Sequence, residues 1–187
     1  MIRNAVITDQ TEVAVLLYNA LHEIAEKLTG GNTHEEVLAG LRHWFSQPGN
    51  RLSYENCLIA EQDGRPVGVI VLYHGNEANR LDAPIVTYLR KLHGDASIIL
   101  EKEADDDEYY IDTLSVHPDY SGKGIGSALI QKAEEQCQML GYHKIAILAD
   151  MSNTRALSLY KHRGYIHDYT ITLVGEPFAH LSKTFMT

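Results

Sequence analysis

Apolar residues in the N-terminal part of the chain recur at helical spacing rather than in strand-like alternation. A short apolar stretch at residues 2–7 predicts a first strand, and Thr8 and Asp9 offer N-caps for a helix that follows it. The spacing continues without interruption to Gly30 and Gly31, which form a strong stop signal. The apolar positions are Val13, Leu16, Leu17, Ala20, Leu21, Ile24 and Leu28. The pattern therefore predicts one strand and then one long helix.

A second helix and a hairpin are expected next. Thr33 and Glu36 form a capping-box pattern that opens a helix through Phe45. Two strand-type runs, at residues 56–61 and 66–73, are separated by a turn containing Asp63 and Gly64, which is a hairpin signal.

The second half of the chain alternates strands with helices. The strands are expected at residues 109–117, 144–148, 165–174 and 178–185, and the helices at residues 124–140 and 153–162. A hairpin followed by strand, helix and strand implies a mixed sheet, antiparallel at first and parallel in the middle. The expected fold class is therefore α/β (α+β), with a central sheet of about seven strands and helices on both faces.

The segment of residues 74–108 is too long for an ordinary hairpin connection, and we interpret it as an insertion. It contains a predicted helix near residues 82–92 and an acidic run at residues 101–108. One interpretation of the run is a solvated acidic surface. The alternatives are a wall of a substrate site or the contact of a homodimer.

The composition is typical of a globular protein of one domain over residues 1–187. The chain is 44% hydrophobic and 22% charged, and its longest apolar run, at residues 67–73, is far shorter than a membrane span. No signal-peptide pattern is present, and Cys57 and Cys137 lack metal or redox spacing. These features predict a cytoplasmic protein with free thiols and no membrane partner.

The net charge of −9 bears on the partners of the protein. A nucleic-acid binder needs cations that displace phosphate counterions, so nucleic acid is not expected. The acidic surface leaves room for a cationic substrate, and the alternative interpretation is that it serves solubility alone.

A glycine-rich turn follows the strand at residues 109–117, where Pro118 breaks the strand. Gly122, Gly124 and Gly126 let a ligand approach the backbone at the start of the next helix. The unpaired N–H groups and the dipole of a helix N-terminus favour anions, and Lys123 adds one cation. The turn alone is compatible with no ligand or with a dinucleotide. The phosphate-loop pattern is absent, and Leu129 stands where a Rossmann fingerprint requires glycine.

The helix at residues 153–162 carries a second signal. Asn153 and Tyr160 are seven residues apart, so they lie on one stripe of the helix with Ala156 and Leu157 between them. Both would face one groove. The alternative is that Asn153 is only an N-cap and Tyr160 a core aromatic residue.

Together these motifs resemble those of the GNAT superfamily of N-acetyltransferases. The match joins a strand ending Leu114-Ser115-Val116-His117-Pro118, the Gly124-x-Gly126 turn, and Asn153-x-x-Ala156-x-x-x-Tyr160-x-x-x-Gly164-Tyr165. It departs from the family at Ser121, where Gln or Arg is usual. The resemblance implies acetyl-CoA as co-substrate, with Tyr160 near its sulfur as general acid. The cofactor-binding residues that it implies are Leu114, Ser115, Val116, Gly122, Lys123, Gly124, Ile125, Gly126, Ser127, Asn153, Ala156 and Tyr160.

The implied reaction is transfer of an acetyl group to a primary amine of a small molecule or peptide by direct attack on the thioester. The alternatives are an acyl-CoA-binding regulatory module without turnover and a nucleotide-dependent enzyme that uses the same glycine turn. An alkylamine has a pKa of about 10, so a base must accept its proton. Tyr110 occupies a strand position that the family commonly uses for this base.

Tyr110 carries no carboxylate, and Asp112 is therefore the first candidate base, with Glu108 in reserve. Asp112 could equally cap a neighbouring loop. The 10 histidines show no metal-ligand spacing, so no metal is expected.

Overall fold

A mixed sheet of seven strands, in the order β1-β2-β3-β4-β5-β7-β6, runs through the computed structural model, which describes residues 1–186. All neighbouring strands are antiparallel except β4 and β5, which are parallel. The strands are β1 (Ile2–Asn4), β2 (Cys57–Gln62), β3 (Arg65–His74), β4 (Tyr109–Val116), β5 (Lys144–Asp150), β6 (Ile166–Leu173) and β7 (Glu176–Thr184). The expected mixed sheet with a parallel centre is confirmed.

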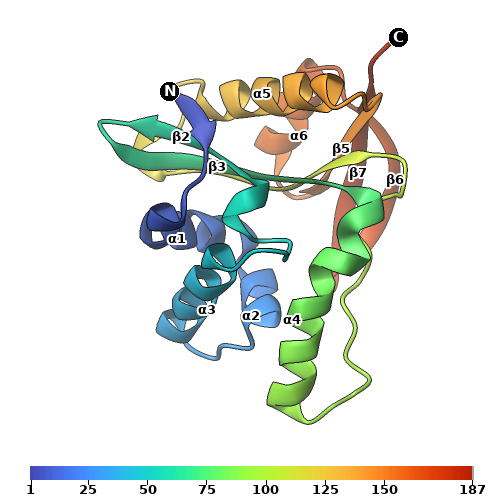
Figure 1. Cartoon of the computed structure of the whole chain (residues 1–187). Helices are drawn as coiled ribbons and strands as arrows, with labels where there is room; N and C mark the ends of the chain where they lie inside the picture. Colours follow the sequence, from blue (N-terminus) through green and yellow to red (C-terminus); the bar gives the residue numbers. More distant parts are fainter. Residues whose placement is uncertain (187) are drawn as a thin grey trace.

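Helices cover both faces of this sheet (Figure 1). One face is covered by α1 (Gln10–Leu21), α2 (Glu23–Thr29), α3 (His34–Ser46) and α4 (Ala78–His93). The other face is covered by α5 (Ile125–Met139) and α6 (Thr154–His162). Each face has its own apolar core, one around Leu17, Phe45 and Val69, the other around Leu129 and Ile147. The expectation of helices on both faces is confirmed.

The capping box predicted for α3 is present. The Glu36 amide donates to Thr33 Oγ1 at 3.2 Å, and the Thr33 amide donates to Glu36 Oε2 at 3.1 Å. Both interactions are local, which is why the start of this helix can be predicted from the sequence alone.

The first strand is shorter than predicted, ending at Asn4 rather than near residue 7. Asp9 Oδ2 accepts the Val6 amide at 2.9 Å, and both Asp9 oxygens accept from the Arg3 guanidinium at 2.8 Å. The Ala5 amide still donates to the Cys57 carbonyl at 3.0 Å, and beyond it the contacts of Asp9 hold the chain in a turn that leaves the sheet before α1 begins.

The single long helix predicted up to Gly30 is wrong, because the chain breaks at His22 into α1 and α2. His22 has φ 45° and ψ −118°, a conformation that non-glycine residues rarely adopt. The apolar spacing is kept on both sides of the break, so Leu17, Ala25 and Leu28 still share one core. Neither glycine nor proline marks the position in the sequence.

The segment of residues 74–108 contains a longer helix than expected, α4, followed by an irregular return to β4. The return packs tightly on Gly75, where a Cβ atom would lie 1.7 Å from the carbonyl oxygen of Asp105. The Gly75 amide also donates to the Glu108 carbonyl at 2.8 Å. A side chain at position 75 would therefore push the returning segment away from the sheet.

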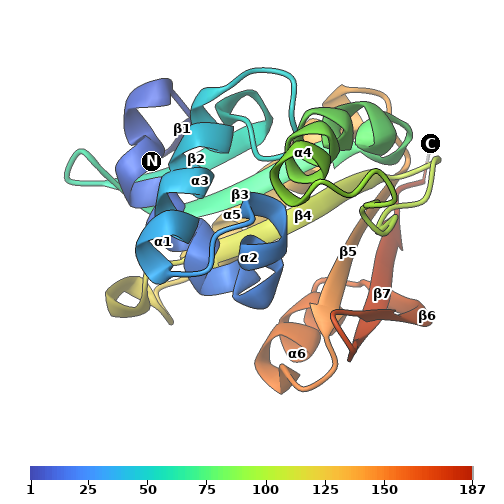
Figure 2. The same cartoon turned by 90° about the horizontal axis from the view of Figure 1, so that it is seen from below.

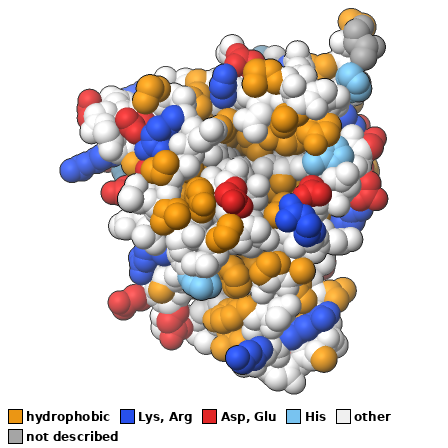
Figure 3. Space-filling model, in the orientation of Figure 1, with side chains coloured by type: hydrophobic (Ala, Val, Ile, Leu, Met, Phe, Trp, Pro, Cys, Tyr) orange, Lys and Arg blue, Asp and Glu red, His pale blue; other side chains and the backbone are white. Residues whose placement is uncertain are grey.

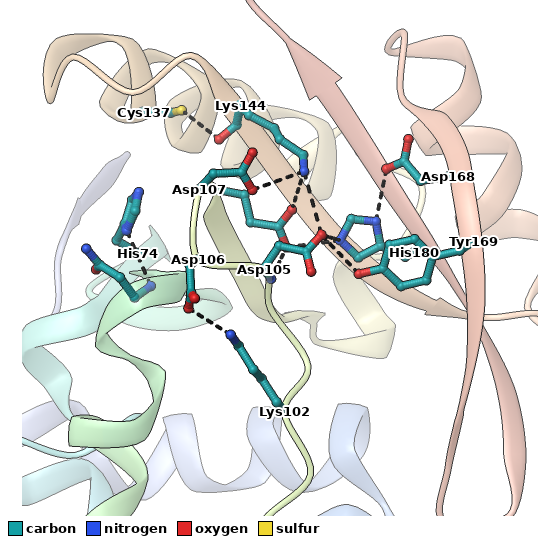
Figure 4. A network of polar contacts seen from close by, with 12 residues as sticks. His74, Lys102, Asp105, Asp106, Asp107, Cys137, Lys144, Asp168, Tyr169 and His180 are labelled. Carbon is teal, nitrogen blue, oxygen red and sulfur yellow. Dashed lines mark hydrogen bonds and ion pairs between the residues drawn. The ribbon is translucent and has the colours of Figure 1, made fainter.

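The acidic run is only partly solvated. Asp106 and Asp107 are exposed, whereas the Glu108 side chain is completely buried. Glu108 Oε1 lies 2.9 Å from His180 Nε2, and His180 Nδ1 lies 3.0 Å from Asp168 Oδ2 (Figure 4). The Lys144 ammonium lies 3.1 Å from Glu108 Oε2. The end of the insertion is thus held by ionic contacts to β5 and β7, and His180 links it further to Asp168 of β6.

The insertion carries several exposed apolar residues. Tyr88, Leu92 and Ile99 are exposed, and hydrophobic side chains gather on the lower half of the face in Figure 3, which the helices below the sheet form. A dimer contact at the insertion stays a prediction. Within residues 1–186 no helix is both long and apolar enough to cross a bilayer.

The ionic contacts of His180 generate a prediction about pH and stability. Burial opposes the charged imidazolium, but the hydrogen bonds and charges of Glu108, Asp168 and Asp105 outweigh it and raise the pKa of His180. A group whose pKa is raised on folding stabilises the protein below its unfolded pKa of about 6.5 and loses that effect as pH rises through the folded pKa. The free energy of unfolding should therefore fall as His180 loses its proton.

Urea unfolding of the wild type and of His180→Gln between about pH 6 and about pH 9 checks this expectation. The variant should be less stable at the acidic end and should lack this part of the pH dependence. His143→Gln is the matched control, because His143 is exposed and adjacent to Lys144. Parallel curves for the wild type and His180→Gln would contradict the assignment.

Candidate active site

The sheet opens between β4 and β5. These strands pair only over Tyr109–Ile111 and Ile145–Ile147, and beyond those residues they diverge (Figure 2). The divergence begins at a β-bulge in β4, where Val71 faces Thr113 and Leu72 faces Ile111, so that Asp112 has no partner on β3. Bulges bend a strand and redirect its side chains. The backbone edge of residues 112–116 is therefore left without a strand on the β5 side.

The glycine turn lies at the end of this open edge. Gly122 and Gly124 have φ values of 78° and 80°, and Gly124 is the N-cap of α5. A Cβ atom at either position would meet nothing within 4 Å, so both face open space. The first amides of α5 have no partner within the helix, which makes this turn suitable for an anion.

A groove of about 550 Å³, here called the glycine-turn groove, runs between the turn and α6. Arg155 also lines it, and this exposed cation stands at a position that the motif Asn153-x-x-Ala156 leaves unspecified. Lys123 does not line the groove, because its ammonium lies over the ring of Tyr120, 4.7 Å from the centroid. The predicted residues that line the groove are Leu114, Val116, Gly122, Gly124, Ile125, Gly126, Ser127, Asn153 and Ala156.

Asn153 and Tyr160 both reach the gap between the strands. Asn153 is the N-cap of α6, and its Oδ1 accepts the Ala156 amide at 3.0 Å. It also lines the glycine-turn groove, so the cap and the groove use the same residue. Tyr160 is only 3% exposed and packs edge-on against Tyr165. Burial raises the pKa of Tyr160, which keeps the phenol protonated at neutral pH.

A smaller cavity of about 160 Å³, here called the central cavity, lies where the strands separate. Tyr160 lines it from α6, Leu114 from β4, and Leu148 and Asp150 from β5. The sequence-predicted residues Leu114, Asn153, Ala156 and Tyr160 thus meet around one space. The carboxylates that line it are those of Glu103, Asp112 and Asp150.

Asp112 is closed in by donors. Its side chain is completely buried, and its Oδ2 accepts from Arg51 Nε at 2.9 Å and from the Tyr73 hydroxyl at 2.7 Å. Its Oδ1 accepts from Thr113 Oγ1 at 2.8 Å. The role of Asp112 as the base stays a prediction. These contacts favour the alternative, in which the residue holds a neighbouring loop, because Arg51 lies in the connection between α3 and β2.

Arg51 is surrounded by carboxylates. Besides Asp112, its Nη2 lies 2.8 Å from Glu103 Oε1 and its Nη1 lies 3.5 Å from Asp82 Oδ1. Burial is the main cause that raises the pKa of Asp82 to about 6. One guanidinium therefore neutralises three carboxylates only in part, next to the central cavity.

A larger groove of about 600 Å³, here called the outer groove, opens on the α1–α2 side of the gap. The break at His22 forms one wall, and the turn between β6 and β7, with Val174 at φ 53° and Gly175 at φ 82°, forms the opposite wall. Ser115 lines this groove rather than the glycine-turn groove. The sequence gives a turn signal at Gly175 but none at His22. The wall formed by the break at His22 could therefore not be predicted from the pattern of apolar residues.

Asp105, Glu108 and His180 are the described residues whose ligand atoms lie close enough together to hold a metal ion. The Lys144 ammonium lies 3.1 Å from Glu108 and 3.7 Å from Asp105 (Figure 4). A cation from the chain itself thus already contacts these carboxylates. Glu108, the reserve candidate for the base, belongs to this network and does not line the central cavity.

The comparisons with known proteins agree with this geometry. Residues 17–165 match the model of the acetyltransferase (GNAT) family. Acetyltransferase SG1711 of Sodalis glossinidius (strain morsitans) is 35% identical over 63 residues, which cover 34% of this chain and 44% of that protein. This match therefore spans less than half of the relative's length.

Two solved structures share the fold. An N-acetyltransferase from Staphylococcus aureus Mu50 is 26% identical, with coverage of 98% of this chain and 100% of that chain and a TM-score of 0.82. The paia N-acetyltransferase from Thermoplasma acidophilum, solved in complex with coenzyme A, is 18% identical, with coverage of 99% and 98% and a TM-score of 0.57. The family match over most of the chain, together with the opened sheet and the glycine turn, establishes that the chain belongs to the GNAT family of acetyltransferases.

Proposed function

We propose that the protein transfers the acetyl group of acetyl-CoA to a primary amine of a small molecule or peptide by direct attack on the thioester. The observation that carries the proposal is the divergence of β4 and β5, which leaves a strand edge open between the glycine turn and Tyr160. An open strand edge can pair with an extended, amide-bearing ligand. The pantetheine arm of coenzyme A has this chemistry.

The cofactor would lie across the glycine-turn groove and the central cavity, which share the lining residues Leu114, Asn153 and Ala156. Its pantetheine amides would pair with the backbone of residues 114–116, and its pyrophosphate would accept from the amides of residues 122–127. The exposed Arg155 offers a cation in the same groove. Because backbone amides provide most of these contacts, Ser121 in place of Gln or Arg would weaken binding rather than abolish it. The Thermoplasma protein of the same fold, which binds coenzyme A, lends support.

The acceptor would enter through the outer groove. Glu23, Asp150 and Glu176 line this groove, and no lysine or arginine is among the described residues that do. A negative lining attracts a cationic amine and raises its local concentration. The proposed acceptor is therefore a primary amine that is charged in solution.

The chemistry requires a nucleophilic nitrogen and a protonated leaving group. The neutral amine forms a bond to the thioester carbon, and the C–S bond then breaks. Tyr160, protonated because it is buried, would donate its proton to the departing sulfur. The thiolate is a tolerable leaving group with a conjugate-acid pKa of about 8.5, so this donation assists rather than decides the reaction.

Turnover itself is tested by thiol release from acetyl-CoA with a panel containing spermidine, tyramine, a lysine peptide and a peptide with a free N-terminus. Thiol release that depends on one of these amines supports the proposal. Binding of acetyl-CoA in calorimetry without thiol release for any amine would instead favour a regulatory acyl-CoA-binding module.

The first prediction of this proposal concerns the pyrophosphate. Gly126 is helical, and a Cβ atom there would meet only Val116 Cγ2 at 3.7 Å. Gly126→Asp would therefore fold, since a carboxylate in the first turn is favourable to the helix dipole. It would also place negative charge against the phosphates. Acetyl-CoA affinity in calorimetry should fall about 10²-fold, which corresponds to about 2.7 kcal/mol.

The neutral variant Gly126→Asn is the matched control for shape. It should lose much less affinity than Gly126→Asp. Equal affinities for the wild type and Gly126→Asp would place the phosphates elsewhere.

The second prediction concerns Tyr160. Tyr160→Phe removes only the hydroxyl, so acetyl-CoA affinity should be retained while kcat falls about 10²-fold, the lower end expected for general acid catalysis. Tyr165→Phe is the control, because Tyr165 packs on Tyr160 but does not line the central cavity. Steady-state kinetics and melting curves of both variants provide the measurement. A normal kcat with a lower melting temperature in Tyr160→Phe would identify a core tyrosine instead.

A further inference from the structure

Glu103 stands between two cavities. It lines the central cavity together with Tyr160, and it also lines a neighbouring cavity of about 120 Å³, here called the side cavity. The side cavity lies between α2 and the returning part of the insertion, and Arg51 lines it as well. Glu103 therefore connects the interior of the gap between β4 and β5 with a space that opens beside the insertion.

The carboxylate of Glu103 is fixed in place. Its Oε1 accepts from Arg51 Nη2 at 2.8 Å, and its Oε2 accepts from the Tyr110 hydroxyl at 3.0 Å. The side chain is 14% exposed. Each carboxylate oxygen has two acceptor positions, so both oxygens retain one for a further donor.

The segment that carries Glu103 is held against the sheet on the C-terminal side of this residue. Asp105 packs on Gly75, where a Cβ atom would lie 1.7 Å from its carbonyl oxygen. The buried Glu108 is anchored to β7 through His180. These contacts hold the backbone on the C-terminal side of Glu103, and Arg51 and Tyr110 hold the carboxylate itself.

The other carboxylates of the central cavity are less suited to accept a proton. Asp112 is completely buried and receives donors from Arg51, Tyr73 and Thr113. Asp150 caps a turn, with its Oδ1 accepting the Ser152 amide at 2.7 Å. Because it also lines the outer groove, through which the acceptor would enter, it is the rival candidate that Asp150→Asn tests. Burial raises the pKa of Glu103, although Arg51 opposes the effect. A raised pKa makes a carboxylate a better proton acceptor near neutral pH.

We propose that Glu103 is the general base that deprotonates the acceptor amine, with Arg51 and Tyr110 as its positioning residues. This inference rests on the proposed acetyltransferase function. Glu103 would take one proton from the ammonium, and the neutral nitrogen would then bond to the acetyl carbon. The C–S bond breaks, and Tyr160 protonates the sulfur. The nitrogen then loses its second proton, which protonates the Tyr160 phenolate again. Glu103 releases its proton to solvent through the side cavity, which gives amide, free coenzyme A and one proton.

The test measures kcat, its pH profile and acetyl-CoA affinity for Glu103→Gln, with the best amine of the panel. The variant keeps the size of the side chain and removes its charge. At neutral pH kcat should fall about 10²-fold, with acetyl-CoA affinity within about twofold of wild type. In the wild type, kcat should fall as the pH is lowered, because Glu103 becomes protonated. The titratable or charged groups around Glu103 are Arg51, Tyr110, Asp112 and Asp82. In Glu103→Gln this fall in kcat should be absent. Glu103→Asp should fold, keep that acid dependence and have intermediate activity.

Three further variants sharpen the result. Asp106→Asn is the control, because Asp106 lies in the same segment, is exposed and lines none of these cavities. It should behave as the wild type. In Asp112→Asn and Asp150→Asn the acid dependence should remain, and its loss in either variant rather than in Glu103→Gln would overturn the assignment.

Failure of this inference is distinguishable from failure of the proposed function. A wild type that acetylates an amine, together with a Glu103→Gln variant of normal kcat, overturns the role of Glu103 alone. A wild type that releases no thiol with any amine overturns both.

Discussion

The buried guanidinium of Arg51 is the interaction on which the site depends. It joins the loop after α3 to Asp82 of α4, Glu103 of the insertion and Asp112 at the bulge of β4. Loss of one partner of a buried pair costs about 3–5 kcal/mol, because the remaining charge is left without compensation. Four separate segments are therefore held together at the point where the sheet opens. Two carboxylates of the central cavity, one of them at the bulge, depend on the same cation.

The bulge at Asp112 lies where β4 stops pairing with β5, and the following edge of β4 has no strand partner on that side. A regular β4 would continue to pair with β5, and its backbone groups would be satisfied within the sheet. The bulge instead bends the strand where pairing ends, and the edge of residues 112–116 faces the gap. The glycine turn and the N-terminus of α5 extend this edge with further backbone donors. The proposed coenzyme site is built mainly from backbone groups, so it would tolerate a side-chain change such as Ser121 better than a site built from side chains.

Charged side chains are distributed unevenly around the gap between β4 and β5. The insertion has an acidic sequence, yet its carboxylates serve different purposes according to burial. Glu108 anchors the segment through His180 and Lys144, Glu103 reaches the central cavity, and Asp106 remains on the surface. The acidic run is thus neither a plain solvated tail nor a uniform wall. Glu108 holds the backbone of the segment, and Glu103, held by Arg51 and Tyr110, lines the same cavity as Tyr160.

The sequence by itself determined the features that depend on neighbours along the chain. The capping box of Thr33 and Glu36, the turn at Asp63 and Gly64, the glycine turn and the stripe of Asn153 and Tyr160 all involve residues within two helical turns of one another. Most strands and helices, the mixed sheet and the family motifs could be predicted for this reason. The roles of individual site residues could only be proposed.

Only the tertiary structure decided where long-range contacts override these local patterns. The break at His22 falls inside an uninterrupted apolar repeat, and nothing in that repeat indicates it. Arg51 meets Glu103 and Asp112 across 52 and 61 residues of sequence, so no local spacing could indicate their contact. The free energy of such buried ion pairs depends on burial and on the full set of partners, which exist only once the chain has folded.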